Sequence, residues 1–438
     1  MALGGGTWSI QNKILPGSYI NFISMARATN SLSDRGVATI PYIGDWGVVG
    51  EVAEITAENF QNKTVSLFGY EWSHEELKEL REFFKHIRIG YLYRLGTGGT
   101  KATSEFATAK FEGLRGNGIK ITIAVNVDDP DKFDVSMFLE TALMDKQTVS
   151  SAEELIDNDF VIYDKEATLS ITAGTPLVGG ANPTVTNADY QSYIDKIESY
   201  SFNVIGCPSD DITVKGLFTA FTKRMRDEMG VKFQCILYSP DENTDYEGCV
   251  DVLNKVTDNG AEEWSLVYWV TGVLAGTAVN KTAMNNVYDG EYIVDTTHTQ
   301  RQLEQAILGG KFVLHRVGNT AVRVLADINS LTTVTAEKGE DFKQNQTIRV
   351  IDQIANDIAV LFATKYMGEI PNDQDGRVSL WADIVKHHND LQTIRAIEDF
   401  AGDDVVVIQG ADKRSVLITD AIMTTGMMEK LYMTVRVS

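Results

Sequence analysis

Apolar and polar positions follow two periods along this chain, one typical of strands and one typical of helices. After residue 35, GVATIPYIG predicts a strand, HEELKELREFFKHI an amphipathic helix and IGYLYRL a second strand. After residue 185 the order is helix, strand, helix, strand, in DYQSYIDKIESY, FNVIGCPS, VKGLFTAFTKRMRDEMG and KFQCILYSP. Strands separated by single helices predict a parallel sheet that is covered on both faces.

Residues 96–184 have a different pattern. FATAKFEG, IKITIAVNV, KFDVSMFLE, DFVIYD and ATLSITAG are short strand-like runs bounded by Gly, Asn, Asp and Pro. We expect a small β-sandwich inserted in the α/β domain.

A third region begins near Leu331. It predicts two long helices, QTIRVIDQIANDIAVLFATKYMG and VSLWADIVKHHNDLQTIRAIEDF, followed by the strands DDVVVIQG and RSVLITDAIM. The chain finishes on KLYMTVRVS, where Leu431, Met433, Val435 and Val437 alternate with Tyr432, Thr434 and Arg436. A final strand of this kind has an edge that needs a partner.

The first 33 residues contain Lys13 and Arg27 but no acid, and glycines and Pro16 interrupt any helical period. A frayed terminus is one interpretation. Against it stand large apolar groups that favour an extended arm buried on another surface: Trp8, Ile10, Ile14, Tyr19, Ile20, Phe22 and Ile23.

Composition narrows the class of protein. A length of 438 residues predicts about three domains. The formal net charge of −22 disfavours nucleic acid as a partner. Cys207, Cys235 and Cys249 show no CxxC spacing, which indicates a reducing compartment. The N-terminus lacks the pattern of a signal peptide, and the most apolar window, Leu266 to Val279, is too short to cross a bilayer, so we expect no membrane insertion.

The usual signatures of catalysis and cofactor binding are missing from the sequence. The glycine-rich GTGG and GLRGNG match neither phosphate-binding motif. The six histidines show no HExxH spacing, and the neighbours His387 and His388 point about 100° apart on a helix, which disfavours a shared metal. There is no GxSxG motif. We expect no enzyme, no cofactor, no metal and no catalytic residue.

Five stretches resemble the contractile tail sheath proteins of bacteriophages and of phage-tail-like bacteriocins from Gram-positive hosts. They are LPGSYINF, with Ser18 where the commoner arm motif has Val, RGVATIPYIGDWGVVGEVAEI, AKFEGLRGNGIKITI, IDKIESYSFNVIGCPSDD and KFQCILYSPDENTDYEGCVDVLN. Their order and spacing match over nearly the whole chain.

The resemblance implies a multidomain α/β plus all-β fold. Its parts would be an N-terminal arm (1–31), a subtilisin-like α/β domain without proteolytic function (32–95 and 185–330), an inserted β-sandwich (96–184), an α+β C-terminal domain (331–423) and a C-terminal arm (424–438). Each subunit would lend both arms, as donor strands, to neighbouring subunits. The arm residues are Trp8, Ile10, Ile14, Pro16, Gly17, Tyr19, Ile20, Phe22, Leu431, Met433, Val435 and Val437.

The same resemblance implies a function. The chain would polymerise helically around a tail tube and contract to drive that tube through a cell envelope. Its partners would be other copies of itself, a tube protein, and baseplate and terminator proteins. It would be made in a host bacterial cytoplasm and released in a virion tail or tail-like particle. We expect the helix at 378–400 to face the tube through Lys386, His387, His388 and Arg395.

Two other classes remain open at this stage. A static coat or surface-layer protein would have arms but no second lattice, and an α/β hydrolase would need a nucleophile and a base within reach of each other.

Overall fold

The computed structural model describes residues 32–437. The described residues fold into two compact units. The central unit comprises residues 33–356, 391–400 and 422–437, and the C-terminal unit comprises residues 357–390 and 401–421. Helices α8 (Asn345–Leu361) and α9 (Gln374–Thr393) contribute residues to both units.

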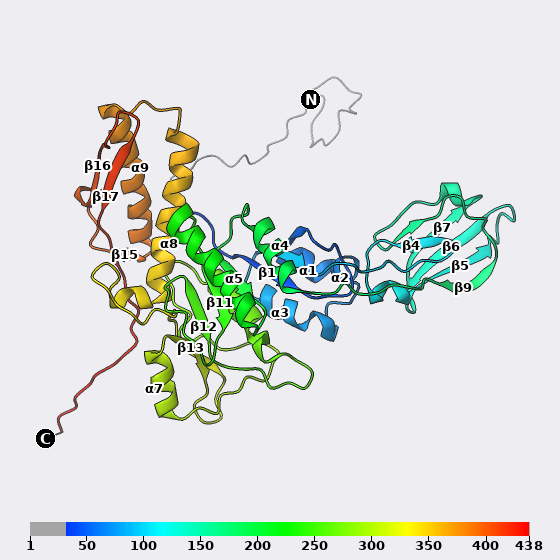
Figure 1. The fold of residues 1–438 in the computed structure, drawn as a ribbon, viewed down its shortest axis with the longest axis horizontal. Coiled ribbons are helices and arrows are strands. Elements are labelled where there is room, and N and C mark those ends of the chain that lie inside the picture. The colour runs from blue at the N-terminus through cyan, green and yellow to red at the C-terminus, as the bar shows by residue number, and fades with distance from the viewer. Residues whose placement is uncertain (1–31, 438) are drawn as a thin grey trace, which may run out of the picture. The chain divides into compact units, whose positions relative to one another are not determined.

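The central unit is built on an eight-stranded sheet (Figure 1). Its strand order is β14-β13-β12-β11-β10-β1-β3-β2, parallel from β13 to β3, with the edge strands β14 and β2 antiparallel to their neighbours. The strands are β1 Val37–Tyr42, β2 Val52–Thr56, β3 Ile89–Arg94, β10 Val204–Cys207, β11 Gln234–Tyr238, β12 Cys249–Val252, β13 Lys311–His315 and β14 Arg323–Ala326. The predicted parallel sheet is therefore present.

Helices cover both faces of this sheet. Side chains alternate along a strand, so Ile236 of β11 packs in one cluster with α3 and α6, whereas Cys235 and Leu237 pack in another with α4 and α5. Burial on both sides explains why every residue of β10, β11 and β12 is buried. The α-helices that lie wholly within the central unit are α1 Ala57–Asn62, α2 Thr64–Phe68, α3 Lys78–Phe84, α4 Asn187–Ile197, α5 Ile212–Lys223, α6 Leu266–Gly276 and α7 Gln300–Leu308.

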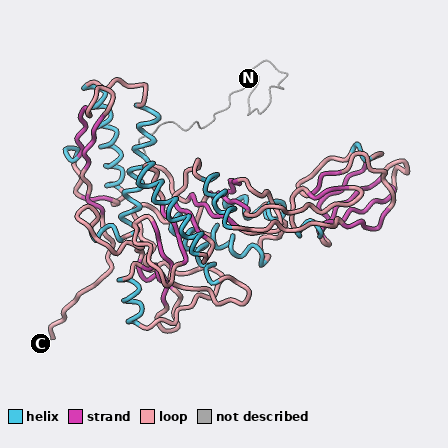
Figure 2. The backbone as a smooth tube through the Cα atoms, viewed as in Figure 1, coloured by secondary structure: helices cyan, strands magenta, loops and turns pink. Residues whose placement is uncertain are grey.

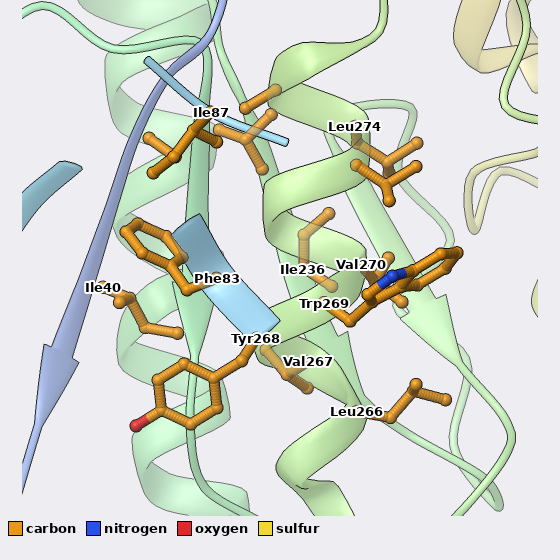
Figure 3. Close-up of a cluster of buried hydrophobic side chains, with 14 of the residues drawn as sticks. Ile40, Phe83, Ile87, Ile236, Leu266, Val267, Tyr268, Trp269, Val270 and Leu274 are labelled. Carbon is orange, nitrogen blue, oxygen red and sulfur yellow. The ribbon is translucent and has the colours of Figure 1, made fainter. Parts of the chain in front are cut away.

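Helix α6 lies at the centre of the larger cluster, with nearly all of its side chains buried (Figure 3). This confirms that the apolar window at Leu266 forms a buried helix. Gly272 lets α6 approach α3 closely, because a Cβ there would lie 2.5 Å from the carbonyl oxygen of Phe83. Within residues 32–437, no helix combines the length and apolarity that crossing a membrane requires.

The inserted region forms a four-stranded antiparallel sheet, β7-β6-β5-β9, and a two-stranded sheet, β4-β8. The two sheets share one apolar cluster. The strands are β4 Ala107–Ala109, β5 Ile119–Val125, β6 Phe133–Leu139, β7 Ala142–Val149, β8 Val161–Tyr163 and β9 Thr172–Pro176. Sequence patterning missed β7. Trp46, from the loop after β1, is buried in this cluster, 5.2 Å from the ring of Phe111.

In the C-terminal unit, α8 ends in a π-helical turn, Phe362–Tyr366, and β16 (Val405–Gln409) pairs antiparallel with β17 (Val416–Asp420). We call β16 and β17 the C-terminal hairpin. The predicted helix at 378–400 is wrong at its end: α9 stops at Thr393, because Arg395 takes a left-handed backbone with φ 60°.

The end of the chain returns to the central unit. β15 (Ile397–Glu398) pairs with β18 (Met423–Thr424), and Gln346 Nε2 donates to the carbonyl oxygen of Thr425. The residues beyond this point form no strand within the described chain, although the alternating pattern predicts one; Figure 2 shows them as loop.

Candidate assembly surfaces

The chain from 425 to 437, here called the C-terminal segment, exposes apolar side chains to solvent. Leu431 is 86% exposed and Val437 is 92% exposed, and Met433 and Val435 are also exposed. An extended segment with apolar groups in water is expected to bury them on another surface. The four predicted C-terminal arm residues are thus all accessible.

The C-terminal hairpin offers a matching surface. Its two strands pair along five residues each, and within the described chain neither pairs with a third strand. Val406, Ile408 and Leu417 are each about half exposed. Since no described strand pairs with either outer edge, each edge can accept an added strand through its backbone N–H and C=O groups.

The predicted N-terminal arm residues lie outside the described residues. They are Trp8, Ile10, Ile14, Pro16, Gly17, Tyr19, Ile20 and Phe22.

The four cations expected to face the tube do not share one environment. Lys386 is exposed and lies 3.3 Å from Asp390 on the same helix, and Arg395 is exposed beyond the end of α9. His387 and His388 are 1% and 0% exposed. Their side chains point into the protein, so the apparent basic run at 386–388 presents only its lysine to solvent.

The two histidines bind carboxylates on either side. His387 Nε2 lies 2.9 Å from Asp357 Oδ2 on α8, and His388 Nε2 lies 2.8 Å from Asp420 Oδ2 at the end of β17. Their Nδ1 atoms lie 3.2 Å apart. This line of contacts joins α8, α9 and the C-terminal hairpin inside one unit. Sequence reasoning missed both aspartates, because no local spacing links them to the histidines.

The carboxyl end of β1 and the three cysteines are two places where chemistry could be expected. The carboxyl end of β1 borders a cavity of about 30 Å³ with aromatic, apolar and acidic walls, where Tyr70 donates to Asp45 at 2.5 Å. Cys207, Cys235 and Cys249 are buried free thiols, and burial raises the pKa of Cys207. In the part of the chain that is described, no group of three or more His, Cys, Asp or Glu side chains is arranged to hold a metal ion.

Comparison with known proteins identifies the family. Three phage tail sheath models match this chain: the β-sandwich domain at residues 97–182, the central domain at 184–330 and the C-terminal domain at 337–438. The chain therefore belongs to the phage tail sheath family, and it is a contractile tail sheath subunit.

Individual relatives agree over the full length. The phage-like element PBSX protein XkdK of Bacillus subtilis (strain 168) is 32% identical, with 100% of both chains covered. The solved sheath tail protein of Desulfitobacterium hafniense is 35% identical with a TM-score of 0.78, covering 93% of this chain and 100% of that one. The solved sheath tail protein of Listeria innocua is 32% identical with a TM-score of 0.79, covering 91% and 94%.

A more distant structure shares the fold alone. The helical sheath of the anti-feeding prophage in its contracted state is 13% identical with a TM-score of 0.59, covering 97% of this chain and 99% of that one.

Proposed function

We propose that copies of this chain polymerise helically around a tail tube by exchanging strands, and that the sheath contracts to drive the tube through a target envelope. The observation that carries this proposal is the C-terminal segment, whose alternating apolar side chains are exposed in the single chain. Burying them on a neighbour removes apolar surface from water, at about 25 cal/mol per Å².

The C-terminal hairpin of a neighbouring subunit is the proposed acceptor. A five-residue strand added to one edge makes about five ladder bonds, each contributing roughly 0.5–1.5 kcal/mol. The half-exposed Val406, Ile408 and Leu417 offer apolar contacts to the incoming strand. Such a joint can persist while the bodies of the subunits rotate during contraction.

The N-terminal arm, residues 1–31, is proposed as the second donor strand. This proposal is supported by the sequence of the arm, which is rich in apolar residues and contains no acid although the whole chain has a net charge of −22. Segment 424–438 is proposed as the C-terminal arm, and residues 96–184 as an inserted domain that faces solvent, since insertions are best tolerated there.

The central domain is proposed to be subtilisin-like in topology and to have no catalytic role. The parallel order from β13 to β3, with helices on both faces, supports that topology. The match of residues 184–330 to the central domain of phage tail sheath proteins supports a structural role.

Further proposals concern the partners. The subunit would contact a tube protein through Lys386 and Arg395, and baseplate and terminator proteins at the ends of the sheath. It would be made in a host bacterial cytoplasm and released in a virion tail or tail-like particle. His387 and His388 are withdrawn from the tube-facing set because they are buried.

Electron microscopy of the purified protein tests the proposal. Hollow striated cylinders are expected; flat sheets would indicate a static coat, and compact particles a soluble enzyme. Met433→Asp with Val435→Asp should abolish the cylinders. Tyr432→Asp with Thr434→Asp adds the same charge on the opposite face of the segment. This control pair should leave more cylinders than Met433→Asp with Val435→Asp does. Equal loss from both pairs would indicate a simple charge effect and contradict strand addition through the apolar face.

A further inference from the structure

A small, positively charged cavity lies in the central unit, beside the residues that lead into β1. Its volume is about 20 Å³, and its walls include Arg35, Lys232, Gln234, Arg349 and Asp352. The assembly surfaces described above do not involve it.

Arg349 leaves hydrogen-bond donors unused in this cavity. The side chain is 1% exposed, and its Nη2 donates to Asp327 Oδ2 and to the carbonyl oxygen of Lys281. Its Nε and Nη1 have no partner among the described residues, although they are buried. Three N–H bonds are therefore unsatisfied, which is costly for a buried guanidinium.

The carboxylates nearby are already engaged. Asp352 receives two hydrogen bonds from Arg226, at 2.6 and 2.8 Å, and Asp327 accepts from Arg349 and from Asn345. Four cations, Arg35, Arg226, Lys232 and Arg349, thus surround two carboxylates. Burial lowers the pKa of Arg35 to about 9, and the charge of Arg349 acts in the same direction.

The walls also carry acceptor oxygens, among them those of Asp352 and Gln234. Asn345 Nδ2 donates to Asp327, so its Oδ1 accepts from Gln234 Nε2 at 2.8 Å, and Gln234 Oε1 has no partner within residues 32–437. A water molecule would satisfy Gln234 but would leave the excess of positive charge uncompensated.

We propose that this cavity binds one monatomic anion, chloride in the cell, held by the N–H groups of Arg349 and by the surrounding cations. The volume is sufficient for one object the size of a water molecule or a monatomic anion. Bound chloride would stabilise the central unit where the chain leads into β1.

Diffraction from crystals of the full chain soaked in sodium bromide tests the site. An anomalous bromide peak within hydrogen-bonding reach of Arg349 Nε or Nη1 is expected. Density that fits water alone, with no bromide signal, would overturn the proposal.

Thermal unfolding of the full chain in solution gives a second measurement. At constant ionic strength, with gluconate as the replacement anion, Tm should rise by about 1–2 °C for each tenfold increase in chloride above its Kd. Ser33 lines the cavity and is exposed. Ser33→Asp places a carboxylate beside the cavity and should remove the chloride dependence, whereas Ser33→Asn should retain it. Equal Tm in chloride and gluconate, or an unchanged dependence in Ser33→Asp, would contradict anion binding.

Discussion

The Nδ1 atoms of His387 and His388, adjacent residues of α9, lie 3.2 Å apart, while their Nε2 atoms contact Asp357 and Asp420. Three contacts therefore run in series from α8, through the two rings of α9, to the end of β17. They connect elements that no local sequence pattern relates.

Replacing His388 tests this arrangement. His388→Leu removes two of the three contacts, including the one that Asp420 Oδ2 makes with the ring, so we expect the free energy of unfolding to fall by about 2–4 kcal/mol. Lys386→Leu, on an exposed position of the same helix, should change it by less than about 0.5 kcal/mol. Urea unfolding of both variants measures the difference. Equal values would mean that the histidine pair contributes little to stability.

A buried carboxyl predicts a pH dependence in the central unit. Glu82 is fully buried, its Oε1 accepts from the backbone N–H of Glu291, and its Oε2 accepts from Tyr288 Oη at 3.0 Å. Burial raises the pKa of Glu82 from 4.5 to about 7, against these hydrogen bonds. The folded chain holds this proton more tightly than the unfolded chain. The contribution of protonated Glu82 to the free energy of unfolding is therefore fully present below pH 4.5 and is lost as the pH rises through about 7. The loss is about 3 kcal/mol.

Glu82→Gln should remove that loss, because the amide stays neutral. At pH 8 we expect the variant to unfold at higher urea than the native protein, and near pH 4.5 at about the same concentration. Glu76→Gln, at an exposed position close by, is the control and should match the native protein at both pH values. A variant no more stable than the native protein at pH 8 would mean that Glu82 ionises normally.

Limited proteolysis of assembled sheath tests the outward position of the inserted domain. The two connecting chains bond to each other, through Thr97 with Thr184 and Thr100 with Ala181. Gly98 is exposed with φ 76°, whereas Gly180 is buried. We expect cleavage near Gly98 without loss of the cylinders and slow cleavage at Gly180. Full protection of Gly98 in the sheath would indicate that this connection lies in a subunit contact.

Charge reversal tests the proposed contact with the tube. Lys386→Glu with Arg395→Glu should give sheath that polymerises but is contracted or empty, because exposed cations form weak, salt-sensitive contacts with carboxylates. Lys110→Glu with Lys132→Glu makes the same change of charge in the β-sandwich and should leave extended, tube-filled tails. If both pairs give normal tails by electron microscopy, the end of α9 is not the tube-binding element.

The local pattern of apolar residues predicted the strands and helices whose burial is regular. It failed where contacts with residues distant in the sequence determine whether a side chain is buried. β10, β11 and α6 followed from continuous apolar runs. The alternation in β7, ALMDKQTV, is too polar to show as a strand, since most of its side chains are at least partly exposed. His387 and His388 resembled a basic surface because their partners lie 30 and 32 residues away along the chain. The cavity at Arg349 likewise collects residues that are far apart in sequence.

Hydrogen exchange, compared between polymerised sheath and the disassembled subunit, tests the strand exchange most directly. We expect backbone amides of residues 430–437 to exchange at least about 100-fold more slowly in the sheath, together with amides at the edges of the C-terminal hairpin. The amides of α6 are buried in the subunit and should not change, which provides an internal reference. If residues 430–437 exchange as fast in intact cylinders as in the free subunit, the C-terminal segment is not a donor strand.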